Sequence, residues 1–445
     1  MRIIDSTDTR AVAALLDRRP GQDRQLEARV RRIVDDVRRR GDKALLAYAQ
    51  KFDRLDGPIE VPREEIEASA RGVAPDVRRA IRTAARNIRQ VSRRQLPRTW
   101  TMSPVAGVSI TQRVMPLDRV GCYVPGGRYP LPSSLLMSAI PARVAGVREI
   151  VVACPKPDPT VMYAAREAGV TRLLRMGGAQ AVAALAYGTA TVPRVDKIVG
   201  PGNAWVALAK MCVAPECAID FHAGPSEIAV LSEHGRPDWI AADLIAQAEH
   251  DPEARAILFT PSLSLALATL AALRTRVPRR GPARLALRRN GGIVLTRTIA
   301  EASELIDRLS PEHLVCDSEV QARRLKRAGT VFVGAFSAQA CGDYATGSNH
   351  VLPTMGAAAA RGGLSAADFV RVATLQRVTR GGLRRIAPVA MALAEAEGLT
   401  AHAESMRIRL RPVTPNRGPQ TADRKTMTAT RLGRPKGLRY VRLVG

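Results

Sequence analysis

Apolar residues near the beginning of the chain recur at the spacing of a helix. Between residues 21 and 95, Ile, Val, Leu and Ala return every three or four positions, while Arg, Asp and Glu fill the other faces. Gly41 separates two of these expected helices, and Pro62 stands near the first turn of another. Residues 1–20 resemble a short helical arm that packs on another part of the molecule. The pattern therefore predicts a helical N-terminal region whose helices each bury one face.

From about residue 111 the pattern changes, and short apolar runs alternate with segments of helical periodicity. Short uninterrupted apolar runs are typical of strands buried on both faces, and intervening helices indicate parallel pairing. We therefore predict an α/β fold with two doubly wound, incomplete Rossmann-like parallel sheets and with helical N- and C-terminal extensions. The expected strands lie at residues 149–153, 172–175, 197–199, 256–260, 292–296, 314–316 and 330–333.

Domain boundaries are placed where these patterns change. The two α/β regions show no sequence repeat strong enough to establish a duplication. A final segment rich in Pro, Gly, Thr and Arg is predicted to be disordered. The predicted parts are a helical arm (1–20), a first α/β domain with a helical N-terminal part (21–115 plus 234–360), a second α/β domain (116–233), a C-terminal helical segment (361–410) and a basic tail (411–445).

Composition narrows the class of protein. The 445 residues exceed one ordinary core, and 46% apolar with only 4% aromatic residues suits α/β layers. No apolar run reaches the roughly eighteen residues that a membrane-spanning helix needs, and the N-terminus does not resemble a secretory signal. The six cysteines lack C-x-x-C pairing and are expected to be free thiols of a reducing compartment. We expect a cytoplasmic protein without a membrane partner.

The formal net charge of +27 raises the question of a polyanionic partner. The densest local excess is the segment 411–445, where nine basic residues accompany one acidic residue, a net charge of +8. Such a protein binds polyanions non-specifically at low salt. However, no helix-turn-helix, zinc-finger or RNP-type pattern accompanies the charge. We therefore predict no specific nucleic-acid partner and attribute the charge to an Arg-rich composition.

Two groups of residues could carry chemistry on helix ends. Gln247 and His250 are three residues apart at the end of a helical run that begins near Pro237, so both project from one face. This pair is either half of a metal site or a solvated polar helix end. In Ser310-Pro311-Glu312-His313, Ser followed by Pro resembles a helix start, whose dipole would keep His313 neutral and usable as a base. The alternative is a capping Glu312 with an incidental histidine.

The remaining candidates lie in loops. Asp343 and His350 belong to a long Gly- and Ala-rich loop, and His402 stands at the start of the last expected helix. His222 and His234 have no acidic or cysteine partner nearby and are interpreted as structural.

Glycine-rich loops follow three of the expected strands, where open α/β sheets bind ligands. They comprise residues 125–127, 176–180 and 200–203. The last of these resembles a dinucleotide fingerprint, but Trp205 replaces its third glycine, so a simple Gly-rich turn is the alternative.

Many separate segments, in order, resemble the histidinol dehydrogenase family over roughly residues 1–410. Among them are CYVPGGRYPLPSSLLMSAIPARVAGV, GGAQAVAALAYGT, DKIVGPGNAWVALAK, IDFHAGPSEI, DLIAQAEHDP, SPEHL, GDYATGSNHVLPT, GGLSAADFV and EGLTAH. Residues 355–361 match loosely, and Arg380-Gly381 stands where an acidic helix former would be more familiar. Neither departure touches a site residue that the resemblance implies.

The resemblance implies a zinc-dependent enzyme that oxidises L-histidinol to L-histidine with two NAD⁺ through a bound histidinaldehyde. It also implies a homodimer with one zinc per subunit, in which the C-terminal helices contribute His402 to the partner's site. Glu312 and His313 are implied as the acid/base pair. Zinc ligands would be Gln247, His250, Asp343 and His402; substrate contacts would be Ser226, Gln247, His250, His313, Asp343, Glu397 and His402; NAD contacts would be Tyr123, Gln180 and Asn203.

Two other functions are compatible with the residues. One is a related zinc- and NAD-linked dehydrogenase acting on another amino- or sulfo-alcohol, although Glu397 suits a substrate ammonium. The other is a basic nucleic-acid-binding protein that retains an enzyme fold. Salt-resistant, sequence-selective DNA binding would support the second alternative.

Overall fold

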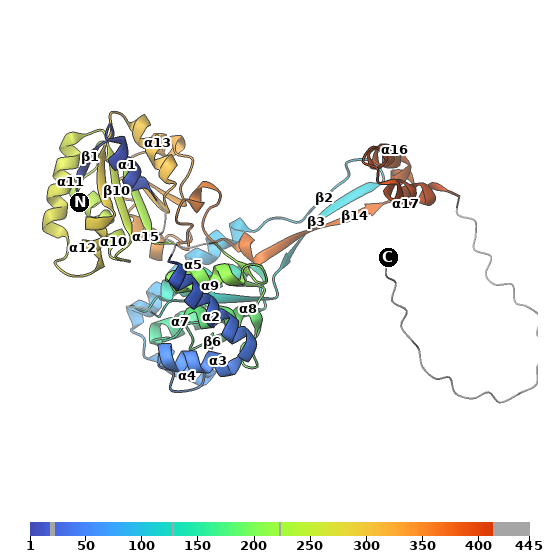
Figure 1. Cartoon of the computed structure of the whole chain (residues 1–445), viewed down its shortest axis with the longest axis horizontal. Coiled ribbons are helices and arrows are strands. Elements are labelled where there is room, and N and C mark those ends of the chain that lie inside the picture. Colours follow the sequence, from blue (N-terminus) through green and yellow to red (C-terminus); the bar gives the residue numbers. More distant parts are fainter. Residues whose placement is uncertain (18–22, 127–128, 222–223, 413–445) are drawn as a thin grey trace, which may run out of the picture. The chain divides into compact units, whose positions relative to one another are not determined.

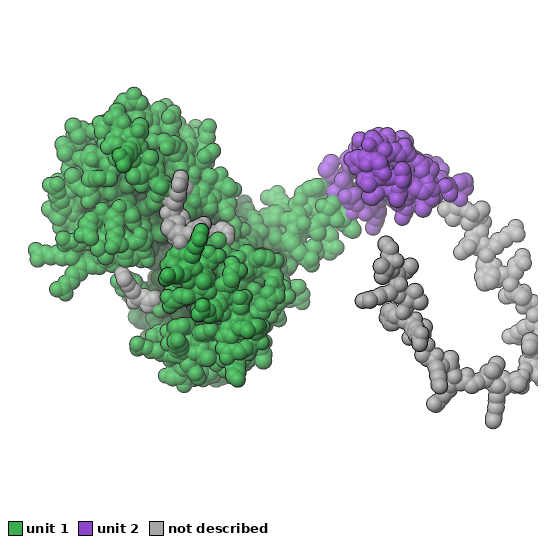
Figure 2. Space-filling model, viewed as in Figure 1, with its two compact units in different colours: residues 1–100, 112–375 green, residues 101–111, 376–445 purple. Residues whose placement is uncertain are grey.

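The computed structural model describes residues 1–17, 23–126, 129–221 and 224–412. The chain forms two compact units, one of residues 1–100 and 112–375 and the other of residues 101–111 and 376–445 (Figure 2). Beyond residue 412, the predicted basic tail lies outside the described residues, as does His222. In the part of the chain that is described, no helix is long and apolar enough to cross a membrane.

A parallel sheet of the first unit has, within the described residues, six strands in the order β1-β11-β10-β9-β12-β13. Figure 1 labels two of these strands, β1 and β10, and several of the helices that pack on them. Side chains alternate between its faces: Ile257 packs with α1 and α13, whereas Leu258 packs with α10, α11 and α12. Helices on both faces confirm a doubly wound sheet. The strands are β1 (Ile3–Asp5), β9 (Glu227–Leu231), β10 (Arg255–Thr260), β11 (Gly291–Leu295), β12 (His313–Cys316) and β13 (Thr330–Val333). The helices are α1 (Thr9–Leu16), α10 (Pro237–Ala248), α11 (Leu263–Arg276), α12 (Pro282–Arg289), α13 (Ile299–Leu309), α14 (Glu319–Arg324) and α15 (Gln339–Tyr344).

The other parallel sheet of this unit has five strands among the described residues, in the order β6-β5-β4-β7-β8. Val152 faces the helices α5, α6 and α7, whereas Val151 faces α2, α3, α8 and α9. The strands are β4 (Arg119–Tyr123), β5 (Glu149–Ala153), β6 (Arg172–Leu174), β7 (Lys197–Val199) and β8 (Ala218–Ile219). The helices that follow these strands are α6 (Pro132–Ala145), α7 (Pro159–Ala168), α8 (Gly178–Tyr187) and α9 (Ala204–Val213).

The N-terminal helices pack differently from the sequence prediction. Residues 21–115 were expected to join residues 234–360, but α2 packs on α8 and α9, α3 packs on α8, and α5 lies against α6. Gly41, at φ 54°, separates α2 from α3 as predicted. The helices are α2 (Arg24–Arg40), α3 (Asp42–Tyr48), α4 (Arg63–Arg71) and α5 (Pro75–Gln95), and a π-helical turn, η1 (Ala49–Asp53), follows α3. Helical periodicity shows which face is apolar but not which sheet it covers.

The first residues also differ from the predicted helical arm. The chain begins with β1, which pairs in parallel with β11 through Ile3, Ile4 and Asp5, and only then enters α1. Burial of Ile4 in the sheet and of Val12 in the helix stabilises this arrangement.

A third sheet has three strands in the described residues, in the order β14-β3-β2. Its strands are β2 (Trp100–Met102), β3 (Val108–Pro116) and β14 (Val370–Val378), and two 3₁₀ turns, η2 (Ala357–Ala359) and η3 (Ala366–Phe369), precede β14. The segment 361–410 was predicted to be helical, so β14 corrects that prediction. Because most of its side chains are exposed, no apolar run marks it in the sequence. Among the described residues, the second unit also contains α16 (Arg380–Ala396) and α17 (Thr400–Leu410), which pack against each other.

Candidate active site

The Glu312-His313 pair lies at the entry to β12, not at a helix start. Ser310 ends α13 in the left-handed conformation, at φ 40°, and its N–H donates to Ile306 O at 2.7 Å. Pro311, which has no N–H to donate, then leads into the strand. The predicted helix start at Ser310-Pro311 is therefore wrong, because the same two residue types also terminate a helix.

Both members of the pair are bound by the backbone of one residue on the adjacent strand. Strand β9 lies beside β12, with Ile228 opposite His313. The N–H of Glu227 donates to Glu312 Oε2 at 2.9 Å, and His313 Nδ1 lies 3.3 Å from Glu227 O. A carbonyl oxygen only accepts, so Nδ1 carries a proton in this contact, and Nε2 is the ring nitrogen that can gain or lose one.

The electrostatics of the pair follow from its burial, since Glu312 and His313 are 6% and 4% exposed. Burial raises the pKa of Glu312 to about 7, although His313 and the Glu227 N–H oppose the shift. Burial by itself would lower the pKa of His313, but the Glu312 carboxylate and Asp343 outweigh it and raise that pKa above its ordinary value. The prediction that a helix dipole keeps His313 neutral is thus wrong, because two carboxylates surround the imidazole.

Asp343 connects this pair to a second group of polar side chains. It lies in α15, is 6% exposed, and its Oδ1 lies 3.7 Å from His313 Nε2. Gln339, one turn earlier, donates its Nε2 to Asp343 Oδ2 at 2.8 Å. Burial alone would raise the pKa of Asp343, but His313, His350 and His250 lower it overall. The loop predicted around Asp343 therefore contains a short helix that presents this carboxylate to His313.

Gln247 and His250 approach the same place from the end of α10. The helix predicted near residues 237–249 is observed, and α10 contacts α15. Gln247 is 1% exposed, and its Oε1 has no hydrogen-bond partner among the described residues. His250 is exposed and lies just after the end of the helix. Its N–H donates to Gln247 O at 3.3 Å. Glu249, at the helix C-cap, is exposed and does not belong to this group.

An oxygen-and-imidazole set of this kind suits a divalent metal ion. A buried amide oxygen without a partner is costly unless a ligand completes it, and Gln247 Oε1 fits a metal-ligand role. No group of three or more His, Cys, Asp and Glu side chains close enough to hold a metal ion is found in the described ranges. The first unit thus offers Gln247, His250 and Asp343, one of which is an amide.

The remaining predicted substrate contacts are Ser226 in the first unit and Glu397 and His402 in the second. Ser226 precedes β9, and its carbonyl accepts from Arg255 N–H at 2.9 Å. Glu397 at the C-cap of α16 and His402 in α17 are both exposed and belong to the second unit. His234, interpreted as structural, is exposed after β9.

The three predicted NAD contacts lie at or after the carboxyl ends of strands of the five-stranded sheet. Tyr123 ends β4, and its hydroxyl accepts from Gly178 N–H at 3.0 Å; burial raises the pKa of Tyr123 to about 12. Gln180, in the first turn of α8, donates its Nε2 to Asp53 Oδ2 at 3.1 Å. The same Asp53 oxygen accepts from Gly177 N–H at 3.0 Å.

Asn203 is the third of these residues and the N-cap of α9. Its Oδ1 accepts from the N–H groups of Trp205 and Val206 at 3.1 and 3.2 Å. The loop before it, from Gly200, therefore opens a helix as the sequence predicted. A Cβ on Gly200 would lie 2.2 Å from Tyr123 O, so only glycine fits where this loop passes β4.

Sequence reasoning missed Asp53, Glu227 and the contacts of His350. Asp53 is more than a hundred residues from its partners, so local pattern gave no signal. Glu227 is a buried acid at the start of the apolar strand β9, a combination that would have indicated a functional position. His350 binds Asp343 O through Nδ1 at 2.8 Å and lies 3.3 Å from Ser134 Oγ through Nε2.

The chain is similar to known proteins over most of its length. The family model described as histidinol dehydrogenase matches residues 16–410. A histidinol dehydrogenase of Cereibacter sphaeroides is 46% identical over 411 residues, which cover 89% of this chain and 95% of that protein. The chain belongs to the histidinol dehydrogenase family.

Further members of the histidinol dehydrogenase family support the assignment. A histidinol dehydrogenase of Chromobacterium violaceum is 43% identical over 417 residues, 90% of this chain and 96% of that protein. A crystal structure of histidinol dehydrogenase from Elizabethkingia anophelis superposes with a TM-score of 0.87 at 32% identity, covering 92% of this chain and 98% of that one. The predicted α/β fold and family are confirmed, and the chain is an enzyme of an oxidoreductase family.

Proposed function

We propose that this enzyme is a zinc-dependent, NAD-linked histidinol dehydrogenase. It carries out the four-electron oxidation of L-histidinol to L-histidine through a bound L-histidinaldehyde, the last steps of histidine biosynthesis. The observation that carries the proposal is the buried Glu312-His313 pair, with His313 Nε2 facing Asp343 beside the end of α10. The 46% identity to a protein named histidinol dehydrogenase supports the choice of substrate.

His313 serves as the base of the first oxidation. Its Nδ1 is turned to Glu227 O, so Nε2 is the atom that takes the proton of the substrate alcohol. NAD⁺, when bound, supplies the hydride acceptor for each oxidation. The carboxylates of Glu312 and Asp343 then stabilise the imidazolium that forms, which matches the raised pKa of His313.

Glu312 serves the second oxidation. With a pKa raised to about 7 by burial, it exchanges a proton readily at neutral pH. As the carboxylate, it takes a proton from the water that adds to the aldehyde, and the resulting gem-diol loses the second hydride. Two successive proton abstractions therefore use two different groups, held side by side by the backbone of Glu227.

The described residues fit zinc through the unpartnered Oε1 of Gln247. Gln247, His250 and Asp343 would hold the ion together with His402 from a second copy of the chain. Zinc, when bound, supplies a Lewis acid that orients the imidazole and amino nitrogens of histidinol. A neutral amide among the ligands keeps the set less negative than an all-carboxylate one. Ser226 and Glu397 complete the substrate contacts, and the carboxylate of Glu397 suits the substrate ammonium.

A homodimer follows from the same assignment and is supported by the second unit itself. Large apolar side chains are exposed on its strand and helices, where a second copy would cover them. They include Met102, Val378, Val389, Leu393, Leu399 and Ile408. Glu397 and His402 are exposed on the same unit and remain available to a partner's site.

NAD is assigned to the carboxyl edge of the five-stranded sheet, with Tyr123, Gln180 and Asn203 as contacts. The close approach of Gly200 to Tyr123 supports this edge as a ligand-binding surface. A cytoplasmic location is proposed with it, supported by the six free thiols.

The test is an assay of the purified, zinc-loaded protein with L-histidinol and NAD⁺, in which NADH formation is followed by absorbance. A sulfonated diol is assayed in parallel as a substrate of the alternative dehydrogenase class. Turnover of histidinol alone supports the proposal. Absence of NADH from histidinol contradicts it, and selective turnover of the sulfonated diol would favour the alternative.

A further inference from the structure

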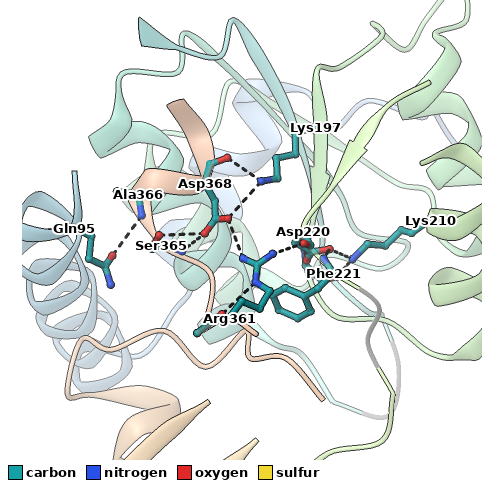
Figure 3. Close-up of polar contacts among 11 residues, drawn as sticks. Gln95, Lys197, Lys210, Asp220, Phe221, Arg361, Ser365, Ala366 and Asp368 are labelled. Carbon is teal, nitrogen blue, oxygen red and sulfur yellow. Dashed lines mark hydrogen bonds and ion pairs between the residues drawn. The ribbon is translucent and has the colours of Figure 1, made fainter. Parts of the chain in front are cut away.

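A buried ion pair binds both the backbone N–H and the backbone C=O of Gly200, which begins a loop proposed to bind NAD. Lys210 Nζ pairs with Asp220 Oδ1, and the two side chains are 2% and 1% exposed (Figure 3). The Gly200 N–H donates to Asp220 Oδ2 at 2.8 Å. Lys210 Nζ donates to Gly200 O at 3.1 Å. The donor and the acceptor of this glycine are therefore each bound by a charged group.

The chain path explains how the two charges reach the same residue. Gly200 directly follows β7, and Asp220 directly follows β8, which pairs with β7 in parallel. Lys210 lies in α9, the helix that the loop opens, and its side chain returns to the beginning of that loop. Gly200 has φ +113° and lies against Tyr123 O, so its orientation is restricted on a third side. Asn203 lies three residues later in the same loop, so the fixed backbone of Gly200 restricts where Asn203 can lie.

Stability alone does not account for a buried pair of this kind. Removing two charges from water costs several kcal/mol per ion, and apolar residues of similar volume often replace buried ion pairs without loss of stability. Here each charge makes a charge-assisted hydrogen bond to the loop backbone in addition to the ion pair. The arrangement thus fixes one conformation of the loop, which a pair of apolar residues would not do.

Asp220 is itself fixed by a second set of charges (Figure 3). Arg361 donates to Asp220 O and stacks on the Phe221 ring, with Cζ 4.7 Å from the ring centroid. It also donates to Asp368 Oδ1 at 2.9 Å. Lys197, on β7, donates to Asp368 O at 2.9 Å. The backbone of Asp220, whose carboxylate binds Gly200, is therefore anchored to the segment that precedes β14.

We propose that Lys210 and Asp220 are positioning residues for the coenzyme. By holding the N–H and C=O of Gly200, they present the Gly200–Asn203 loop in the conformation that binds NAD⁺. Neither side chain reaches the surface, so they act through the loop and do not touch the coenzyme. This inference rests on the proposed NAD-dependent function. It predicts that their loss weakens NAD⁺ binding and leaves histidinol binding unchanged.

The test compares three double variants with the wild-type holoenzyme. Lys210→Met/Asp220→Asn removes both charges at similar volume and leaves Gly200 O without its donor. Lys210→Gln/Asp220→Asn is the conservative counterpart, since the glutamine amide can still donate to that carbonyl. Arg119→Met/Glu149→Gln is the control, because it removes a partly buried ion pair at the opposite, amino ends of β4 and β5.

For Lys210→Met/Asp220→Asn we expect KM for NAD⁺ and Kd for NADH to rise about tenfold, as loss of one strong hydrogen bond implies. KM for histidinol should stay within about twofold of wild type. The Gln/Asn variant should recover most of the coenzyme affinity, and the control should keep all of it. Circular dichroism and thermal unfolding establish that each variant folds.

Three outcomes overturn the inference. One is unchanged NAD⁺ affinity in the folded Met/Asn variant, and another is an equal loss of affinity for NAD⁺ and histidinol. The third is failure of both Lys210 variants to fold while the control folds, since the pair would then be structural only. Absence of histidinol oxidation by wild-type protein instead contradicts the proposed function, and coenzyme binding, measured by NADH fluorescence, still tests the positioning role.

Discussion

Nε2 of His313 lies 3.7 Å from Oδ1 of Asp343, although thirty positions separate the two residues in the chain. The contact places the proposed base beside a proposed zinc ligand, and the other ring nitrogen of His313 is turned to Glu227 O. The proposed acid/base chemistry and the proposed metal site would therefore meet beside this imidazole, and substitutions on either side of it should have separable effects.

Glu312→Gln should impair the second oxidation more than the first. The amide keeps the shape of the side chain but does not take a proton from water, and such groups typically contribute about 10²- to 10⁴-fold to a rate. We expect kcat for histidinaldehyde to fall by about 10²-fold or more, with KM for histidinol nearly unchanged. Single-turnover NADH formation from histidinol and from histidinaldehyde measures the two steps. The counterpart His313→Asn should slow the alcohol step at least as strongly, and equal effects of both variants on both steps would contradict the assignment.

The stability of the metal-free protein should depend on pH through Glu312. Its folded pKa of about 7 lies above the ordinary value, so the folded state keeps a proton that the unfolded chain has lost. In the wild type, the contribution of Glu312 to the free energy of unfolding is present at low pH and is lost as the pH rises toward about 7. Because glutamine stays neutral, Glu312→Gln should gain stability relative to wild type between about pH 5 and about pH 8.

At the lower pH Glu312 is already protonated in the wild type, so the substitution removes no carboxylate partner from His313 there. Urea unfolding of the wild type and of Glu312→Gln at about pH 5 and about pH 8 gives the difference between their free energies of unfolding. A difference that stays constant or decreases with pH would show that the buried carboxyl does not titrate as described.

Gln247→Leu should abolish stoichiometric zinc binding without destabilising the metal-free protein. Leucine removes the buried Oε1 that lacks a hydrogen-bond partner, so the metal-free chain should be as stable as wild type or more so. Zinc per chain, measured by mass spectrometry after dialysis, should fall by at least about tenfold. Glu249→Gln is the matched control, because Glu249 lies between the proposed ligands in sequence but is exposed at the helix C-cap. Full zinc content in Gln247→Leu would remove Gln247 from the ligand set.

Mixing two inactive variants should restore activity if His402 serves the other subunit. His402→Ala and His313→Ala proteins are each expected to be inactive. After unfolding and refolding together in equal amounts, half of the dimers are hybrids, each with one intact site, so about a quarter of wild-type activity should return. Separately refolded samples of each variant are the control. No recovery in a mixture that contains hybrids would place His402 in its own chain's site.

Much of the fold was predictable because the strands are short and buried on both faces. The expected strand at residues 197–199 matches β7, and the helix predicted from Pro237 matches α10. The local sequence pattern gave a wrong prediction where one residue pair is compatible with two different structures. Ser310-Pro311 reads as a helix start, yet the left-handed φ of Ser310 makes it a helix end. Strand β14 escaped prediction because its exposed side chains form no apolar pattern.

The candidate site was predictable only as a set of residues. The sequence places Gln247 and His250 near one helix end, although α10 ends at Ala248, before His250. That this helix end lies beside the helix of Asp343 depends on the packing of α10 against α15. The ion pair of Lys210 with Asp220 likewise depends on the parallel pairing of β7 with β8. Asp53 reaches Gln180 from an element that the sequence pattern assigned to the other sheet. Contacts between residues so far apart in the chain cannot be predicted from the local spacing of residue types.

The stoichiometry of NADH to histidinol tests the central claim most directly. A limiting amount of L-histidinol is incubated to completion with zinc-loaded enzyme and excess NAD⁺, and NADH and L-histidine are both quantified. The proposed function predicts two NADH and one L-histidine for each histidinol, with no aldehyde released. One NADH per histidinol with free aldehyde, or no NADH at all, would contradict it.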